Sequence, residues 1–153
     1  MMRIALCQPD IPQNAGTLMR MAACFGLGVD LIGPLGFSMD EKRLRRAGMD
    51  YLDHLDLVRH DSWDVFRLAA DAGGRRLVLL TTRAETSYLD FAFSDSDVLI
   101  AGSESAGAPD EVHASVNARI RVPMVAAVRS LNVAVAMAMV TGEALRQVVH
   151  ESA

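Results

Sequence analysis

Three stretches of the sequence place small or polar residues where an apolar α/β core does not need them, and each could carry part of a binding or catalytic site. The first, residues 14–20, has the sequence NAGTLMR. Its Asn14 amide and Arg20 guanidinium are both hydrogen-bond donors. They lie six positions apart and share no strict helical face, but an irregular turn could bring both to one cleft. The alternative interpretation makes Asn14 a helix N-cap and Arg20 a solvated helix residue.

The second stretch, residues 101–109 with the sequence AGSESAGAP, directly follows an apolar run. Ligands of open α/β sheets bind at the carboxyl ends of strands, and glycine lets a ligand approach the backbone closely. The glycine spacing excludes a G-x-G-x-x-G fingerprint and a Walker A loop. Neither Ser103 nor Ser105 has the flanking glycines of a nucleophile elbow. The stretch is therefore either a ligand-binding loop or an ordinary strand-to-helix turn.

The third stretch combines residues 120–124, IRVPM, with residues 129–132, RSLN, which lead into a long helical pattern. Ser130 or Asn132 could cap that helix, which alone would explain their residue types. The start of the helix would also offer free N–H groups to a polar ligand. The functional interpretation gains strength only when the three stretches are taken together.

The elements that must position these stretches alternate between strand-like and helix-like patterns. Apolar runs predict strands at residues 3–7, 29–32, 77–80 and 98–101. Helical patterns lie at residues 13–25, at 40–47, from an N-cap at Ser62 to residue 72, and at 130–149. This alternation predicts an α/β fold with a parallel sheet. The length of 153 residues without an internal linker predicts a single domain, 1–153.

Charge and cysteine content limit the classes of partner. The formal net charge of −4 argues weakly against general affinity for nucleic acid. One dense basic segment nevertheless exists, made of Lys42, Arg43, Arg45 and Arg46. Cys7 and Cys24 are too few for a disulfide framework and are predicted to be small buried hydrophobes. The four His are scattered, so no metal site is expected.

Hydrophobic residues make up 51% of the chain. No apolar run reaches the roughly 18 residues that span a bilayer, so a membrane protein is not expected. The surplus indicates instead that some apolar surface is buried against a partner subunit. Residues 1–6 begin no apolar segment that ends in a cleavage site, so we expect no secretory signal and a cytoplasmic location.

Together the three stretches resemble the motifs of the SPOUT methyltransferases, and the whole chain looks like their compact TrmL-type tRNA 2′-O-methyltransferases, which modify the wobble nucleotide. Residues 8–16, QPDIPQNAG, are similar to the family's E-P-x-I-P-x-N-x-G. Residues 42–51, KRLRRAGMDY, match its basic segment K-R-L-R-R-A-G-L-D-Y, which is far more specific than any glycine pattern. Residues 129–132 correspond to its R-S-x-N.

The resemblance implies a parallel sheet flanked by helices, whose C-terminal segment threads a loop to form a deep trefoil knot. It also implies that the knot binds S-adenosyl-L-methionine near the interface of a homodimer and releases S-adenosyl-L-homocysteine. Carried over by position, the cofactor pocket would consist of Leu80, Thr81, Gly102, Ser103, Glu104, Gly107, Val122, Met124, Ser130, Leu131 and Asn132.

The implied reaction moves the cofactor's methyl group to the ribose 2′-hydroxyl of tRNA nucleotide 34, a cytidine or a carboxymethylaminomethyluridine, without a metal. The resemblance places Arg20 beside the attacking hydroxyl. Because Arg stays protonated, stabilising the developing alkoxide or a nearby phosphate suits it better than acting as a base. Asn14 would hold Arg20 or the substrate, and Ser130 would touch the ribose. The basic segment (Lys42, Arg43, Arg45 and Arg46) would contact tRNA phosphates on a surface built by two subunits.

The sequence departs from the family pattern at four positions: Ser103 replaces Pro, Ala106 replaces a frequent Arg, Ala108 replaces Leu, and Gly142 replaces an aromatic residue. Two other hypotheses are a SPOUT enzyme acting on another tRNA or rRNA ribose, and a non-catalytic, cofactor-binding RNA partner. The compact length favours the wobble nucleotide, and the presence of both Asn14 and Arg20 favours catalysis.

Overall fold

The computed structural model describes residues 1–40, 42, 50–128 and 130–151. Six strands form one sheet in the order β3-β2-β1-β5-β4-β6, and every neighbouring pair is parallel. The strands are β1 Arg3–Cys7, β2 Gly28–Ile32, β3 Leu57–His60, β4 Arg76–Leu80, β5 Asp97–Ala101 and β6 Ala118–Ile120. The predicted parallel α/β sheet is thus confirmed.

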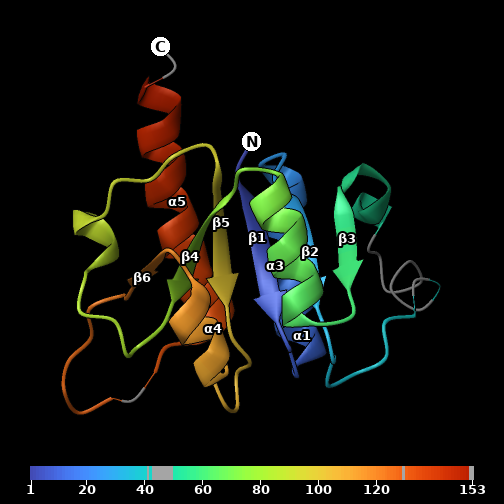
Figure 1. Cartoon of the computed structure of the whole chain (residues 1–153), viewed down its shortest axis with the longest axis horizontal. Coiled ribbons are helices and arrows are strands. Elements are labelled where there is room, and N and C mark those ends of the chain that lie inside the picture. The colour runs from blue at the N-terminus through green and yellow to red at the C-terminus, as the bar shows by residue number, and fades with distance from the viewer. Residues whose placement is uncertain (41, 43–49, 129, 152–153) are drawn as a thin grey trace.

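Helices cover both faces of the sheet (Figure 1). The helix α1, Pro12–Cys24, packs with α5, Val133–Glu151, over one face, where Leu18 and Met137 belong to the same buried cluster. The other face carries α3, Trp63–Ala72, and the short α4, Asp110–Ser115. Two 3-10 turns complete the described elements: η1 Asp50–His54 and η2 Tyr88–Asp90. The molecule therefore has three layers, with the buried strands β2, β1 and β5 side by side in the middle layer.

The four predicted strands are confirmed to within one residue at their starts. The edge strands β3 and β6 and the helix α4 were not predicted. Because β3 carries Arg59 and has two exposed residues, it lacks a continuous apolar run, and β6 has only three residues. The helix predicted at residues 40–47 falls mainly outside the described residues.

Helix starts follow the caps that the side chains provide. Ser62 caps α3 as predicted, because its Oγ accepts a hydrogen bond from the Val65 N–H at 3.3 Å. The interpretation of Asn14 as an N-cap is wrong: α1 begins earlier, at Pro12, whose ring suits the first helical position. The predicted start of α5 at residue 130 is also wrong. Asn132 caps that helix through its Oδ1, which accepts from the N–H groups of Ala134 and Val135.

Of the two cysteines, only Cys7 is buried as predicted. The expectation that Cys24 is buried is wrong, because it ends α1 on the exposed side. Two buried carboxylates are paired: Asp30 binds Arg3 at 2.7 Å and His60 at 2.8 Å, and Asp97 binds Arg76 at 2.6 Å. These pairs tie neighbouring strands to each other and hold buried charge in a satisfied state.

Among the described residues, no helix is long and apolar enough to cross a membrane. Within the same described part of the chain, no group of three or more His, Cys, Asp or Glu side chains is arranged to hold a metal ion.

Candidate active site

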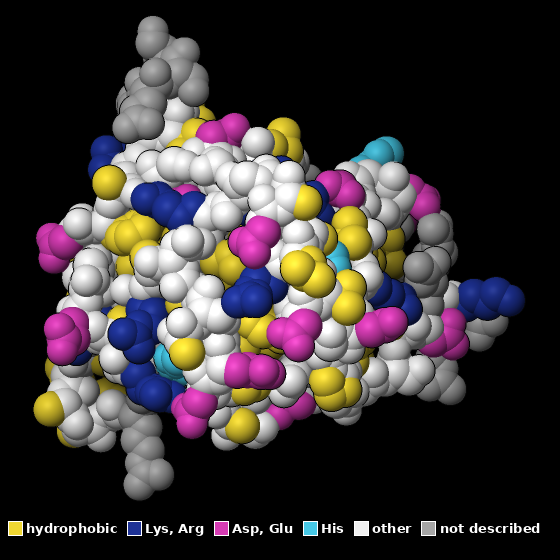
Figure 2. Space-filling view, in the orientation of Figure 1, with side chains coloured by type: hydrophobic (Ala, Val, Ile, Leu, Met, Phe, Trp, Pro, Cys, Tyr) yellow, Lys and Arg dark blue, Asp and Glu magenta, His cyan; other side chains and the backbone are white. Residues whose placement is uncertain are grey.

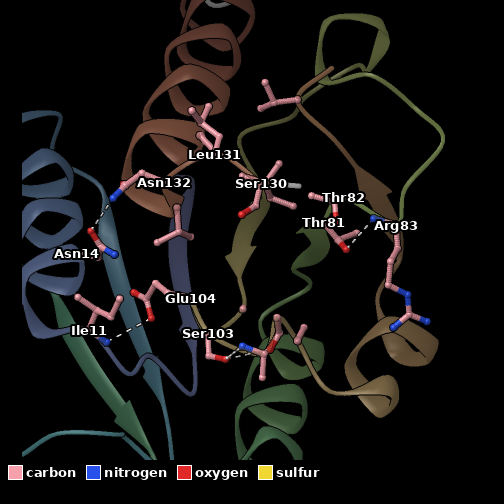
Figure 3. Close-up of a pocket in the computed structure, with 18 of the residues that line it drawn as sticks. Ile11, Asn14, Thr81, Thr82, Arg83, Ser103, Glu104, Ser130, Leu131 and Asn132 are labelled. Atoms are coloured by element: carbon pink, nitrogen blue, oxygen red, sulfur yellow. Dashed lines mark hydrogen bonds between the residues drawn. The ribbon is translucent and has the colours of Figure 1, made fainter. Parts of the chain in front are cut away.

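The candidate site lies between two neighbouring strands whose following helices pack on opposite faces of the sheet. The strands β1 and β5 are neighbours, but β1 leads into α1 on one face and β5 leads toward α4 on the other. Such a switch point leaves a crevice at the carboxyl ends of the strands, where α/β proteins bind ligands. A cavity of about 540 Å³ occupies this position (Figure 3).

The walls of this cavity contain every residue of the predicted cofactor pocket. The end of β4 with the loop after it, the loop after β5, and the segment between β6 and α5 supply these residues: Leu80, Thr81, Gly102, Ser103, Glu104, Gly107, Val122, Met124, Ser130, Leu131 and Asn132. Asn14 also lines the cavity, from the first turn of α1. Segments that are far apart in the sequence are therefore brought together at one place, although their individual roles stay predictions.

Eight further lining residues were missed: Ile11, Thr82, Arg83, Ala106, Ala108, His113, Val133 and Ala136. Thr82 and Arg83 follow the end of β4, so the rule that ligands bind at strand ends could have found them. Ala106 and Ala108 lie in the glycine-containing loop already singled out. His113 comes from α4 and no sequence signal marks it.

The loop after β5 is a tight turn closed on itself. Ser103 and Gly107 form an antiparallel bridge, with the Gly107 N–H donating to the Ser103 carbonyl at 2.9 Å. Gly107 has a φ of +70°, a conformation that favours glycine. A Cβ on Gly102 would lie 2.3 Å from the Ala108 nitrogen. Packing within the loop therefore requires a glycine at position 102. Gly102 also lines the cavity, and its contact with a ligand stays a prediction.

Glu104 connects this loop to the start of α1. Its Oε2 accepts hydrogen bonds from the N–H groups of Asp10 at 3.1 Å and of Ile11 at 3.3 Å. In return, Asp10 Oδ1 accepts from the Glu104 N–H at 3.1 Å, and the Ser105 hydroxyl donates to Asp10 Oδ2. Hydrogen bonds with Glu104 and Ser105 lower the pKa of Asp10 to about 2, so this carboxylate is ionised at neutral pH. The loop and the helix start therefore form one unit.

A second connection joins α1 to α5. The Asn132 Nδ2 donates to Asn14 Oδ1 at 3.2 Å (Figure 3). The same Asn132 caps α5 through its Oδ1. Ser130 lines the same cavity. Two of the predicted catalytic residues, Asn14 and Ser130, are therefore at the cavity.

The third predicted catalytic residue, Arg20, does not line the cavity. It is exposed on α1, and its guanidinium carbon lies 5.8 Å from the centre of the Tyr51 ring. The Tyr51 hydroxyl donates to the Gly16 carbonyl at 3.0 Å and so fixes the ring against α1. Of the basic segment, Lys42 is exposed, and Arg43, Arg45 and Arg46 lie outside the described residues.

This arrangement, a parallel α/β sheet with a polar and apolar cavity at its switch point, defines a ligand-binding domain of the kind that α/β enzymes use. Residues 1–142 match the model of the SpoU rRNA Methylase family. The chain belongs to this family.

Curated relatives cover nearly the whole chain. It is 55% identical over 145 residues, 95% of its own length and 91% of the relative's, to the tRNA (cytidine(34)-2′-O)-methyltransferase of Beijerinckia indica subsp. indica. It is 38% identical over 149 residues, 96% of its length and 94% of the relative's, to the enzyme of the same name from Escherichia coli K12.

Solved structures agree with this. One solved structure concerns the 2-OH methylation of C/U34 on tRNA. Its sequence is 44% identical to this chain and the two structures superpose with a TM-score of 0.87, over 96% of this chain and 95% of the other. The SpoU methyltransferase AviRb from Streptomyces viridochromogenes, in complex with AdoMet, is 27% identical with a TM-score of 0.82. That match covers 96% of this chain but only 57% of the AviRb chain.

Proposed function

We propose that this protein transfers a methyl group from S-adenosylmethionine to the ribose 2′-hydroxyl of the wobble nucleotide, position 34, of tRNA. The observation that carries the proposal is the 55% sequence identity to a relative named for this reaction, in a match that covers 91% of the relative's length. The cavity at the switch point provides the place for the chemistry. The proposed substrate implies a cytoplasmic location, and we treat residues 1–153 as one domain that performs the reaction.

The cavity suits the cofactor in size and chemistry. Its volume of about 540 Å³ lies within the usual range for cofactor sites. Apolar side chains of Leu80, Val122 and Leu131 supply flat walls for an adenine ring. Polar groups of Thr81, Ser103 and Asn132 line the same cavity, where they can fix its orientation by hydrogen bonds.

When bound, S-adenosylmethionine would supply an electrophilic methyl group on sulfur. The carbon–sulfur bond would break as the ribose oxygen takes the methyl, the hydroxyl proton would leave to water, and S-adenosylhomocysteine would remain. The protein's contribution is then alignment and exclusion of water. Asn14 and Ser130 offer an amide and a hydroxyl at the cavity wall, where they can hold the ribose. The reacting hydroxyl must therefore enter between the first turn of α1 and the segment before α5.

Arg20 acts on the substrate from outside the cavity. It lies six residues beyond Asn14 along α1, which corresponds to about 9 Å of helix. A guanidinium at that distance suits contact with an adjacent tRNA phosphate, or with charge that develops on the ribose oxygen, better than proton abstraction. The exposed Lys42, with Arg43, Arg45 and Arg46, extends the tRNA contact.

The active form is proposed to be a homodimer. Exposed apolar residues lie along one side of α5 at Val135 and Met139, four residues apart. This spacing places both residues on one helical face, which is the apolar surface that we propose a second subunit covers. Gly142 continues the face one turn further, and a Cβ there would meet nothing within 4 Å, so a second helix has room to approach.

The dimer is tested by light scattering during gel filtration. The wild-type protein should have about twice the chain mass of 16.5 kDa. Val135→Asp should give the monomer mass, whereas Val65→Asp on α3 should not, although Val65 and Val135 are both 49% exposed. A monomeric wild-type protein would contradict the proposal.

We also propose the C-terminal trefoil knot. Both ends of the loop that follows β4 are hydrogen-bonded to the end of β6. The Ile120 carbonyl accepts from the Thr81 N–H at 2.9 Å. The Arg121 backbone N–H donates to the Thr86 carbonyl, and the Arg121 carbonyl accepts from the Tyr88 N–H, each at 2.9 Å. The chain that continues toward α5 must pass this loop closely. If both termini are pulled apart in a single-molecule experiment, a knotted chain stops short of the fully extended length of about 540 Å.

The function is tested by incubating the protein with labelled S-adenosylmethionine and unmodified tRNA, and by mapping the modified nucleotide with mass spectrometry. A 2′-O-methyl group at nucleotide 34 is expected. A mark on another tRNA or rRNA ribose would keep the chemistry and replace the substrate. Cofactor binding without transfer to any RNA would favour the non-catalytic alternative. The rRNA alternative has less support, because this chain spans only 56% of the similar rRNA methyltransferase chain from Sinorhizobium meliloti.

A further inference from the structure

A second cavity, of about 430 Å³, lies between α4, β6 and the loop after β4. Its charged and titratable lining residues are Arg83, Asp110, His113 and Arg119. Arg83 and His113 also line the first cavity, so the two cavities are adjacent. Figure 2 shows basic side chains gathered around a histidine over the region of α4 and β6.

His113 lines this cavity as a buried side chain with one ring nitrogen that forms no hydrogen bond within the described part of the chain. The residue is only 7% exposed, and its Nδ1 has no hydrogen-bond partner among the described residues. A buried polar atom without a hydrogen-bond partner is unfavourable, so such an atom calls for a ligand or an ordered water. Burial, and then the charges of Arg83 and Arg119, lower the pKa of His113. The ring is therefore neutral at pH 7, with one nitrogen able to donate and the other able to accept.

The two arginines give the cavity a net positive charge. Arg83 donates from Nη1 to Asp110 Oδ1 at 2.9 Å, but the Asp110 side chain is 94% exposed, so water weakens this pair and the guanidinium keeps other donors free. In Figure 3 Arg83 stands on the side of the first cavity opposite Asn14. Arg119 is exposed on β6, and we find no ion-pair partner for it in the described part of the chain.

We propose that the second cavity binds a phosphate group of the tRNA backbone, through the guanidinium groups of Arg83 and Arg119 and the ring of His113. This proposal rests on the proposed function, because a ribose held at the first cavity has a phosphate on either side within one nucleotide. Guanidinium groups present paired donors that match phosphate oxygens. A protein with a net charge of −4 needs such local cationic sites to hold a polyanion.

A carboxylate of the cofactor is the competing occupant, since Arg83 and His113 border both cavities. Arg119 separates the two possibilities, because it lines only the second cavity. The experiment therefore compares Arg119→Gln and Arg119→Lys with the control Arg67→Gln, which alters an exposed arginine on α3. For each protein, the affinity for unmodified tRNA is measured at several salt concentrations, and the affinity for S-adenosylhomocysteine is measured by calorimetry.

Arg119→Gln should weaken tRNA binding about five- to eightfold at 0.1 M salt and reduce the slope of log K against log salt by about 0.7–0.9, the effect of one lost phosphate contact. Arg119→Lys should keep most of the slope because it keeps the charge. Arg67→Gln should change neither quantity, and S-adenosylhomocysteine affinity should be the same in all proteins.

Three results would overturn the proposal. If Arg119→Gln keeps the wild-type tRNA affinity and slope while the wild-type protein methylates nucleotide 34, this inference fails and the proposed function stands. If the same variant loses affinity for S-adenosylhomocysteine instead, the cavity belongs to the cofactor. If wild-type protein neither binds nor methylates tRNA, both the inference and the proposed function fail.

Discussion

Asn132 uses both ends of its side-chain amide, and this makes it the most connected residue of the candidate site. Its oxygen accepts from the N–H groups at the start of α5, and its nitrogen donates to Asn14 on α1. One side chain therefore stabilises a helix and aligns two elements that border the cavity. The two roles can be separated by substitution because they need different atoms.

Asn132→Ala should lower the free energy of unfolding by about 1 kcal/mol, the usual cost of a lost N-cap, and should also reduce methyl transfer. Asn132→Ser restores a good cap but is too short to reach Asn14. Its stability in urea denaturation should therefore recover while its transfer rate stays low. Recovery of both quantities in Asn132→Ser would mean that the bond to Asn14 has no part in the reaction.

Arg20 tests the catalytic assignment because it lies outside the cofactor cavity. Arg20→Ala should lower kcat by about 10²–10³-fold, as expected when a group that stabilises developing charge is removed. Cofactor affinity, measured by calorimetry, should stay within a few-fold of wild type. A loss of cofactor affinity as large as the loss of activity would instead make Arg20 a structural residue.

The two cysteines should differ sharply in reactivity. Burial, together with the charge of Glu111, raises the pKa of the Cys7 thiol to about 11, whereas Cys24 is exposed. At pH 8 only about one Cys7 in a thousand would be a thiolate, the form that reacts. A thiol reagent should therefore modify one cysteine in the native protein and two in denaturant. Native Cys24→Ser should not react; rapid labelling of that variant would show that Cys7 is accessible.

At the scale of elements, the start of α1 is held by a residue of the loop that follows β5. Its N-cap, Ile11, provides no side-chain hydrogen bond, and Glu104 from the loop after β5 accepts from the backbone in its place. A carboxylate at a helix N-terminus also interacts favourably with the helix dipole. The position of Asn14 therefore depends on the same loop that lines the cofactor cavity.

Glu104→Ala should lower the free energy of unfolding by about 1–2 kcal/mol, because two backbone N–H groups lose their acceptor. Glu104→Gln keeps one acceptor oxygen and should recover most of this loss. The fluorescence of Trp63, which is buried, reports unfolding in urea. Glu85→Ala, at an exposed carboxylate, is the control and should be neutral. Equal destabilisation by the Ala and Gln changes at Glu104 would contradict the capping role.

Elements with strong local signals were the ones that could be predicted from the sequence. The buried run of β5 and the Ser62 cap of α3 each carry their information within a few neighbouring residues. By contrast, β3 exposes Val58 and Arg59, so its own residues give only a weak strand signal. It is a strand because it pairs with β2, which lies far from it in the sequence. The same limit applies to the site: the loop at 101–109 was visible, whereas His113 reaches the cavity only through the packing of α4.

At the scale of the whole molecule, the cavity is bordered by segments that follow four different strands of the sheet. Residues after β1, β4, β5 and β6 all border it, and they span positions 11 to 136. A ligand that contacts all of these segments must stabilise the complete sheet rather than one loop. The folded state is then favoured by the binding free energy, which depends on ligand concentration.

S-adenosylhomocysteine at one hundred times its Kd should therefore stabilise the protein by about 2.7 kcal/mol, which corresponds to an increase in Tm of roughly 5–10 °C for a domain of this size. Adenosine alone should give a smaller increase, because it lacks the amino acid part. Ala106→Trp places a bulky ring at an exposed position of the cavity wall. This variant should melt at nearly the wild-type temperature without ligand and lose most of the increase with it. An undiminished increase in Ala106→Trp would move the cofactor site away from this cavity, and with it the assignment of the loop at 101–109.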